Sequence, residues 1–125
     1  MGNSISIAET SDSPGIVLDR EKNVFEISGR SMPENTWKFY APVMEWLEEY
    51  VKSPNDETVF YFKLDYFNSS SAKKFIDIIS LLERIEAGGK VVKVIWYHSN
   101  EDEIMKERGE EFRDMTEIPF EVTTY

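Results

Sequence analysis

Three adjacent serines stand where an apolar run of this chain ends, in the stretch Asn68-Ser69-Ser70-Ser71. The run before them, "TVFYFKLDYF", is almost entirely apolar or aromatic, and an amphipathic pattern begins directly after them. A serine hydroxyl in such a place can cap a helix, accept a phosphoryl group or act as a nucleophile. One serine is enough for a helix cap, so capping accounts for only one of the three.

Phosphorylation is the first functional hypothesis for these serines. A hydroxyl in the first turn of a helix is exposed and faces backbone N–H groups that lack a helical partner. A phosphate there carries about −1.5 to −2 charges and is tolerated by the helix dipole. Lys73, four residues after Ser69, is placed to pair with it. We therefore expect a phosphate at this point to alter partner binding more than folding.

A nucleophilic serine is the second hypothesis, which would make the chain a small serine hydrolase. His98 ends the next apolar run and could approach the serines, with Asp65 or Asp77 orienting its ring. However, the chain has no Gly-x-Ser-x-Gly elbow and no apparent oxyanion loop. A single histidine is a narrow basis for acid–base chemistry, so this hypothesis is the weaker one.

The acidic stretch "NEDE" at residues 100–103 raises the question of a metal site. Its oxygen atoms suit Mg²⁺ or Ca²⁺, but it lacks the spacing and the glycine of a calcium loop. Acidic residues are favourable at a helix start in any case, and we interpret the stretch in that way. The chain also lacks a Walker A motif, a dinucleotide fingerprint and zinc-ligand spacing. No metal and no cofactor is therefore predicted.

Composition limits the partners of the chain. Its 125 residues include 24 acidic and 14 basic side chains, for a net charge of −10, which argues against nucleic acid or an anionic membrane as main ligand. There is no cysteine, so disulfide and thiolate chemistry are excluded. No apolar run is long enough to span a membrane, and residues 1–15 lack the pattern of a secretory signal. We expect a cytoplasmic protein.

Short apolar and β-branched runs predict strands near both ends of the chain. Ile5 and Ile7 alternate with small residues, and the runs "IVLD" and "VFEISG" flank the polar residues 20–23. Two such runs around a four-residue loop predict an antiparallel hairpin. The stretch 118–125 predicts an edge strand, with Pro119 near its start.

The stretch 31–54 predicts the first helix, because apolar residues recur there at steps of three and four. Ser31 with Glu34 fits a capping box, and Asn35 is an alternative N-cap. Pro42 lies inside the pattern and predicts a kink or a second helix start. The predicted inner face consists of Trp37, Tyr40, Met44, Leu47 and Val51.

Two apolar runs, 58–68 and 90–98, predict buried strands, and the first has the pattern of a central strand covered on both faces. A second helix is predicted between them, from about Ser70 to Ala87, with Gly88 and Gly89 ending it. A strand, a helix and a strand of these lengths form a right-handed crossover with parallel strands. The predicted inner residues of this helix are Phe75, Ile78, Ile79, Leu82 and Ile85.

A third, shorter helix is predicted within residues 100–115, and Gly109 weakens it. Its predicted inner residues are Ile104, Met105, Phe112 and Met115. The order of elements predicts an α/β fold in a single domain over residues 1–125. Its mixed sheet would combine the N-terminal antiparallel hairpin with parallel strands, flanked by about three helices.

Four stretches of the chain, "ISGRSMPENTWKFYAPVMEWLEEY", "LDYFNSSSAKKFIDIISLLE", "GGKVVKVIWYH" and "GEEFRDM…IPFEV", together carry a resemblance to a known family. They resemble the SiaC-type bacterial regulatory phosphoproteins, long known only as a domain of unknown function. The match covers nearly the whole chain in the right order, and "MPEN" and "YFNSSSAK" are its most specific parts.

The resemblance implies a single-domain α/β protein similar to the STAS fold of anti-sigma factor antagonists. In the family, a dedicated Ser/Thr protein kinase phosphorylates a Thr or Ser of an Asn-Thr/Ser-Ser-Ser motif, and a PP2C-type phosphatase reverses the reaction. The unphosphorylated form binds and activates a diguanylate cyclase, which raises cyclic di-GMP and favours biofilm formation. The implied function is therefore a non-enzymatic, phosphorylation-controlled regulator. An anti-sigma factor antagonist with the same switch and a different partner is the alternative.

Carried over to this chain, the resemblance makes Ser69 the phospho-acceptor, and Asn68, Ser70 and Ser71 complete its motif. The family usually has Thr where this chain has Ser69, which leaves Ser70 as a rival acceptor.

The residues Pro33, Glu34 and Asn35 match a second signature of the family. The resemblance implies that they lie on the surface that faces the partner. Lys73 is expected to contribute to the same surface. No family role attaches to His98.

Overall fold

The computed structural model describes residues 4–125, and these residues form a six-stranded sheet with three helices. The strands are β1 (Ser4–Ile7), β2 (Gly15–Asp19), β3 (Val24–Ser31), β4 (Glu57–Phe67), β5 (Val91–His98) and β6 (Phe120–Thr124). The helices are α1 (Thr36–Tyr50), α2 (Ser69–Ala87) and α3 (Glu103–Arg113). The predicted α/β fold and its order of elements are confirmed. Residues 1–3 of the predicted domain lie outside the described range.

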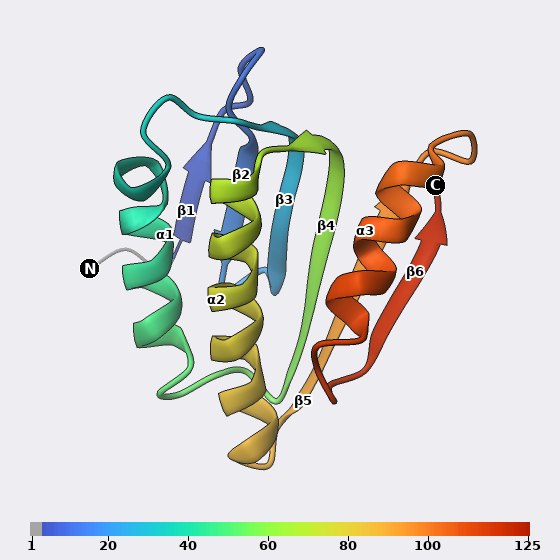
Figure 1. The fold of residues 1–125 in the computed structure, drawn as a ribbon. Helices are drawn as coiled ribbons and strands as arrows, with labels where there is room; N and C mark the ends of the chain where they lie inside the picture. The colour runs from blue at the N-terminus through green and yellow to red at the C-terminus, as the bar shows by residue number, and fades with distance from the viewer. Residues whose placement is uncertain (1–3) are drawn as a thin grey trace.

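The strands lie in the sheet in the same order as in the sequence, from β1 to β6. The pairs β1–β2 and β2–β3 are antiparallel, which confirms the predicted hairpin, and the three remaining pairs are parallel. One helix connects each parallel pair. Because right-handed crossovers that advance in one direction put every helix on the same face, the three helices lie together, in front of the sheet in Figure 1.

The central strand β4 is therefore covered on one face only, and the prediction of cover on both faces was wrong. Phe60 and Phe62 are fully buried beneath the helices, whereas Tyr61 between them is only partly buried. On the open face of the sheet, the rings of three tyrosines stack on one another. The centre of the Tyr97 ring lies 6.1 Å from that of Tyr61 and 5.4 Å from that of Tyr125, and the planes of both pairs are nearly parallel.

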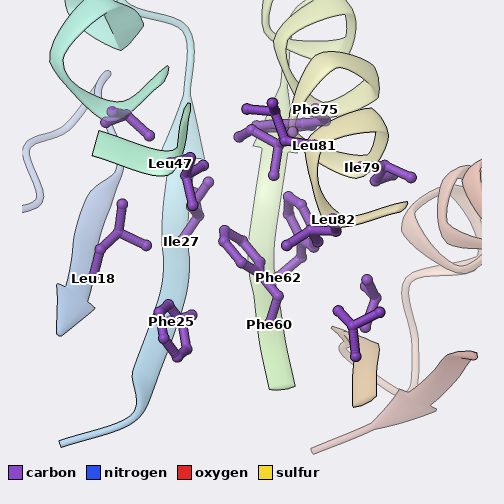
Figure 2. Close-up of a cluster of buried hydrophobic side chains, with 14 of the residues drawn as sticks. Leu18, Phe25, Ile27, Leu47, Phe60, Phe62, Phe75, Ile79, Leu81 and Leu82 are labelled. Carbon is purple, nitrogen blue, oxygen red and sulfur yellow. The ribbon is translucent and has the colours of Figure 1, made fainter. Parts of the chain in front are cut away.

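The hydrophobic core fills the layer between the sheet and the helices. Figure 2 shows Phe60 and Phe62 of β4 beside Leu82 of α2, and Ile27 of β3 beside Leu47 of α1. Each helix buries one face, and in residues 4–125 no helix has the length and hydrophobicity to cross a membrane. The predicted inner residues of α2 are all buried: Phe75, Ile78, Ile79, Leu82 and Ile85.

Helix α1 begins after Asn35, whose side-chain oxygen accepts a hydrogen bond from the Lys38 N–H at 3.0 Å. The capping box of Ser31 with Glu34 is therefore wrong, because Ser31 is the last, buried residue of β3. The helix passes Pro42 without a second start. Of its predicted inner residues, Tyr40, Leu47 and Val51 are buried, Met44 is half-buried and Trp37 is 72% exposed.

Helix α3 is held close to the sheet by Gly109. A Cβ atom at this position would lie 2.4 Å from Cδ1 of Trp96, so no other residue fits without displacing the indole ring. The predicted inner residues Met105 and Phe112 are buried. Ile104 is 67% exposed instead, because the short helix turns only a narrow stripe toward the sheet. Met115 lies beyond the end of α3 and is 60% exposed.

Candidate functional site

The serine stretch forms the first turn of α2, directly after the carboxyl end of β4. Asn68 is the N-cap: its side-chain oxygen accepts from the Ser71 N–H at 2.9 Å, and its carbonyl accepts from the Ala72 N–H at 3.0 Å. The Asn68 N–H in turn donates to the carbonyl of Ser31 at 3.0 Å. Capping is thus performed by the asparagine, and the three serines are left for other contacts.

Ser71 is buried, and its hydroxyl makes two hydrogen bonds with Ser31. Its hydroxyl donates to the Ser31 carbonyl at 2.9 Å and accepts from the Ser31 hydroxyl at 2.8 Å. The Ser31 hydroxyl lies 2.6 Å from that of Tyr40, and because Ser31 donates to Ser71, Tyr40 is the donor in this pair. Burial raises the pKa of the Tyr40 phenol well above its usual value, so the phenol keeps the proton that it donates.

Ser70 is exposed, but its hydroxyl is engaged. It lies 2.7 Å from the hydroxyl of Thr36, the first residue of α1, and donates to the side-chain oxygen of Asn68 at 3.2 Å. These contacts join the starts of α1 and α2. A phosphate on Ser70 would disturb the hydrogen bond with Thr36.

Ser69 is the serine with an uncommitted hydroxyl. Its side chain is exposed and makes no hydrogen bond with any residue in the described part of the chain. As the first residue of α2, it also precedes the first helical hydrogen bond, so its backbone N–H has no partner within the helix. Exposure and freedom from other contacts are what a kinase needs in an acceptor, and here Ser69 combines them.

Ser69 stands at the rim of a groove between α2 and α3, with a volume of about 440 Å³. Its walls are largely apolar. Ala72 and Ile76 of α2 contribute to one wall, and Ile104 of α3 and Met115, just after the end of α3, contribute to the other. Tyr66, Phe67, Met105 and Phe112 complete the apolar lining. The two charged side chains that line the groove are Arg108 and Glu111, which pair with each other at 3.0 Å.

Lys73 lines a hollow that adjoins this groove, and Ile76 borders both. Lys73 is exposed and shares the hollow between α1 and α2 with Ser70 and Trp37. It lies one turn after Ser69 on α2, but the structure shows no hydrogen bond between its ammonium group and the Ser69 hydroxyl. The exposed indole of Trp37 beside it gives this hollow one apolar wall.

The signature Pro33, Glu34 and Asn35 lies in the loop between β3 and α1. Pro33 is buried, whereas Glu34 and Asn35 are exposed and line a shallow hollow with Lys38. Asn35 caps α1, and the next residue is Thr36, whose hydroxyl meets Ser70. The loop thus connects to the serine stretch through the first turn of α1.

The residues of a serine hydrolase are not assembled within the part of the chain that the structure describes. His98 is buried, and its Nδ1 lies 2.8 Å from the Ser99 carbonyl. Asp65 is exposed on β4, and Asp77 lies 3.9 Å from Lys74 on the outer side of α2. Neither carboxylate contacts the imidazole, and no serine hydroxyl does so.

The acidic stretch before α3 acts as a helix start, as predicted. The side chain of Asp102 is the N-cap and accepts from the Met105 N–H at 3.1 Å. Among residues 4–125, no three His, Asp or Glu side chains come together as a group that could hold a metal ion.

Four residues of the site were not found from the sequence. The sequence pattern places Ser31 at a helix cap and Tyr40 in the core, and nothing in their spacing shows that Ser31 hydrogen-bonds both Tyr40 and Ser71. Thr36 directly follows the "PEN" signature, which is the one signal that could have singled it out. Arg108 occurs in a run of mixed charges, where nothing distinguishes it from its neighbours.

The comparison with known proteins decides the family. The pattern that defines the SiaC family of regulatory phosphoproteins matches residues 7–125. This chain belongs to the SiaC family. A protein of Pseudomonas aeruginosa (strain UCBPP-PA14) is 30% identical over 121 residues, which are 97% of this chain and 96% of that protein.

Solved structures of SiaC proteins have the same fold. Apo-SiaC from P. aeruginosa aligns with a TM-score of 0.88 and 29% identity, over 96% of this chain and 98% of that one. A crystal structure of the P. aeruginosa diguanylate cyclase SiaD in complex with its activator SiaC contains a chain that aligns with a TM-score of 0.91 and 30% identity. That alignment covers 97% of this chain and 99% of the other. A relative in the SiaC family thus works by binding a signalling enzyme.

Proposed function

We propose that this chain is a non-enzymatic regulator that binds a signalling partner and is switched by reversible phosphorylation of Ser69. The observation that carries the proposal is the difference among the three serines. Ser71 is buried and Ser70 is engaged with Thr36, whereas Ser69 is exposed and uncommitted at the rim of an apolar groove. A kinase can therefore reach Ser69 without breaking a contact of the fold.

A diguanylate cyclase is the partner that we propose, because SiaC of P. aeruginosa activates the diguanylate cyclase SiaD. In this proposal the unphosphorylated form binds and activates the cyclase in the cytoplasm. A dedicated Ser/Thr kinase adds the phosphate and a PP2C-type phosphatase removes it. The output is cyclic di-GMP, and through it biofilm formation.

The chemistry of the groove supports this direction of the switch. A phosphate on Ser69 would bring about −1.5 to −2 charges to the rim of a surface formed by Ile76, Ile104 and Met115. A partner that covers these apolar side chains would have to desolvate the phosphate, which is costly for a charged group. The fold itself would tolerate the charge, because it lies at the positive end of the α2 dipole. The phosphate therefore acts on binding.

The experiment uses the cognate diguanylate cyclase and three variants of this chain. Ser69→Ala should bind and activate the cyclase even when the kinase is active, and Ser69→Asp should bind more weakly. Ser70→Ala is the matched control, because it removes a neighbouring hydroxyl and should remain a kinase substrate. Phosphopeptide mass spectrometry after treatment with the kinase should find the phosphate on Ser69 in the parent chain and in Ser70→Ala.

Two results would reject the switch at Ser69. One is phosphorylation of the Ser69→Ala variant to the same extent as the parent chain. The other is equal affinity of Ser69→Ala and fully phosphorylated parent chain for the cyclase, measured by calorimetry at one ionic strength.

A further inference from the structure

A phosphate on Ser69 would be stabilised by a nearby cation, and two basic side chains are candidates. Lys73 lies one turn after Ser69 on α2 and lines a hollow that it shares with Ser70. Arg108 of α3 lines the groove that contains Ser69 itself. The two hollows adjoin, because Ile76 lines both of them.

Arg108 is the basic side chain that lines the groove with Ser69. Its guanidinium is bound to Glu111 at 3.0 Å, one turn along α3, and both side chains are more than half exposed. An exposed pair of this kind contributes little to stability. The exchange of a single carboxylate for a phosphate would therefore be favourable for Arg108, since arginine binds a phosphate with two parallel N–H donors.

We propose that Arg108 is the phosphate receptor within the chain, and that phosphoserine 69 draws its guanidinium away from Glu111 and across the end of the α2–α3 groove. The start of α2 supplies the other contacts. The first helical hydrogen bond is made by the Ala72 N–H and the asparagine cap takes that of Ser71, which leaves the N–H groups of Ser69 and Ser70 for phosphate oxygens.

When Ser69 carries a phosphate, residues of the chain itself would therefore block the end of the groove. The phosphate–guanidinium pair would lie between Ile104 of α3 and the first turn of α2, where an apolar partner side chain would otherwise enter. This inference rests on the proposed function, because it explains how the phosphate weakens partner binding. It adds a named receptor for the phosphate, and it predicts that the release of Glu111 accompanies phosphorylation.

The other charged groups near Ser69 come from two further elements. Arg30 of β3 lies over the ring of Tyr66, 5.2 Å from its centre, and Tyr66 lines the groove. Lys73 of α2 is the cation nearest in sequence. Both serve as comparison positions, because either would hold the phosphate if Arg108 did not.

The test is a ³¹P NMR titration of the full chain carrying genetically encoded phosphoserine at position 69. The second pKa of a phosphoserine is about 6, and a paired guanidinium lowers it by stabilising the dianion. The pH midpoint of the phosphoserine titration should be lower in the parent chain than in Arg108→Gln, by roughly several tenths of a pH unit. Lys73→Gln and Arg30→Gln should titrate like the parent chain. Circular dichroism should show all four proteins folded, since all three substituted side chains are exposed.

Either of two outcomes overturns the proposal. Arg108→Gln could titrate like the parent chain, or the midpoint could rise in Lys73→Gln or Arg30→Gln and not in Arg108→Gln. The titration needs neither kinase nor cyclase, so its failure leaves the proposed switch standing. Equal binding of the cyclase by phosphorylated and unphosphorylated chain would instead reject the proposed function, while the titration would still report on Arg108.

Discussion

The hydroxyl of Ser71 donates to the backbone carbonyl of Ser31, forty residues earlier in the chain, at a distance of 2.9 Å. The same carbonyl accepts from the N–H of Asn68. The start of α2 is thus fixed to the end of β3 by two hydrogen bonds to one oxygen atom. This attachment holds the first turn of α2, and Ser69 with it, in place on the sheet.

Ser71→Ala should destabilise the fold. It removes the buried hydroxyl and leaves the Ser31 hydroxyl without its acceptor, which costs about 1–3 kcal/mol in the free energy of unfolding. Ser69→Ala is the matched control and should change stability by less than about 0.5 kcal/mol, because that hydroxyl is exposed and uncommitted. Urea unfolding followed by circular dichroism checks both values. Equal stability of the two variants would contradict the structural role of Ser71.

Asn68→Ala should lower the free energy of unfolding by about 1 kcal/mol through loss of the N-cap. Asn68→Asp should restore most of that loss, because a carboxylate also accepts from the Ser71 N–H and faces the positive end of the helix dipole. The comparison separates capping from a general need for a polar residue. Thermal unfolding of both variants at neutral pH measures it, and a failure of aspartate to rescue would argue against the cap.

Gly109→Ala should be destabilising, although alanine is the better helix former. At an exposed helical position the exchange gains about 1 kcal/mol. Here the new methyl group would overlap the ring of Trp96, and such overpacking costs about 1–3 kcal/mol or more. Glu107→Ala, on the exposed side of α3, is the control and should be nearly neutral. A rise in the unfolding midpoint of Gly109→Ala would show that the indole ring moves freely.

Tyr40→Phe should change how stability depends on pH. Burial raises the pKa of Tyr40 above the usual value of 10.0, so above pH 10 the unfolded chain loses this proton while the folded chain keeps it. The contribution of Tyr40 to stability is therefore complete below pH 10. It decreases as the pH rises further, by at most about 1.4 kcal/mol per pH unit.

The measurement for Tyr40 is the difference in free energy of unfolding between the parent chain and Tyr40→Phe. At neutral pH the parent should be more stable by about 1 kcal/mol, because the phenol donates to Ser31. That advantage should shrink between pH 10 and pH 11. A constant difference over this range would show that the phenol ionises equally well in the folded chain.

Most of the fold could be predicted from periodicity. Three features are local patterns: the amphipathic stripe of α2, the glycines that end this helix, and the apolar runs before and after it. The folded chain keeps the secondary structure that such local patterns predict. The cover of β4 could not be predicted in this way. Tyr61 and Tyr97 are aromatic residues of a kind often found in a core, but here they stack on each other at the open face of the sheet. Only the order of the strands shows which face the helices cover.

The candidate site was predicted in part for the same reason. The place of the serines at a strand end and a helix start follows from the local pattern. Which serine is buried, engaged or free depends on Ser31 and Thr36, which lie 40 and 34 residues from their partners. The groove that Ser69 shares with Arg108 depends on how α3 packs beside α2, which no local pattern shows.

The sequential strand order has a consequence for how the serine turn of α2 is assembled. Each strand pairs only with strands adjacent to it in the chain, so the sheet can grow one strand at a time as the chain leaves the ribosome. The hydrogen bonds that join Ser71 to Ser31 and Ser31 to Tyr40 can form once α2 has left the ribosome, before α3 has done so. In the growing chain the first turn of α2 can therefore be fixed to the sheet before the groove between α2 and α3 is complete.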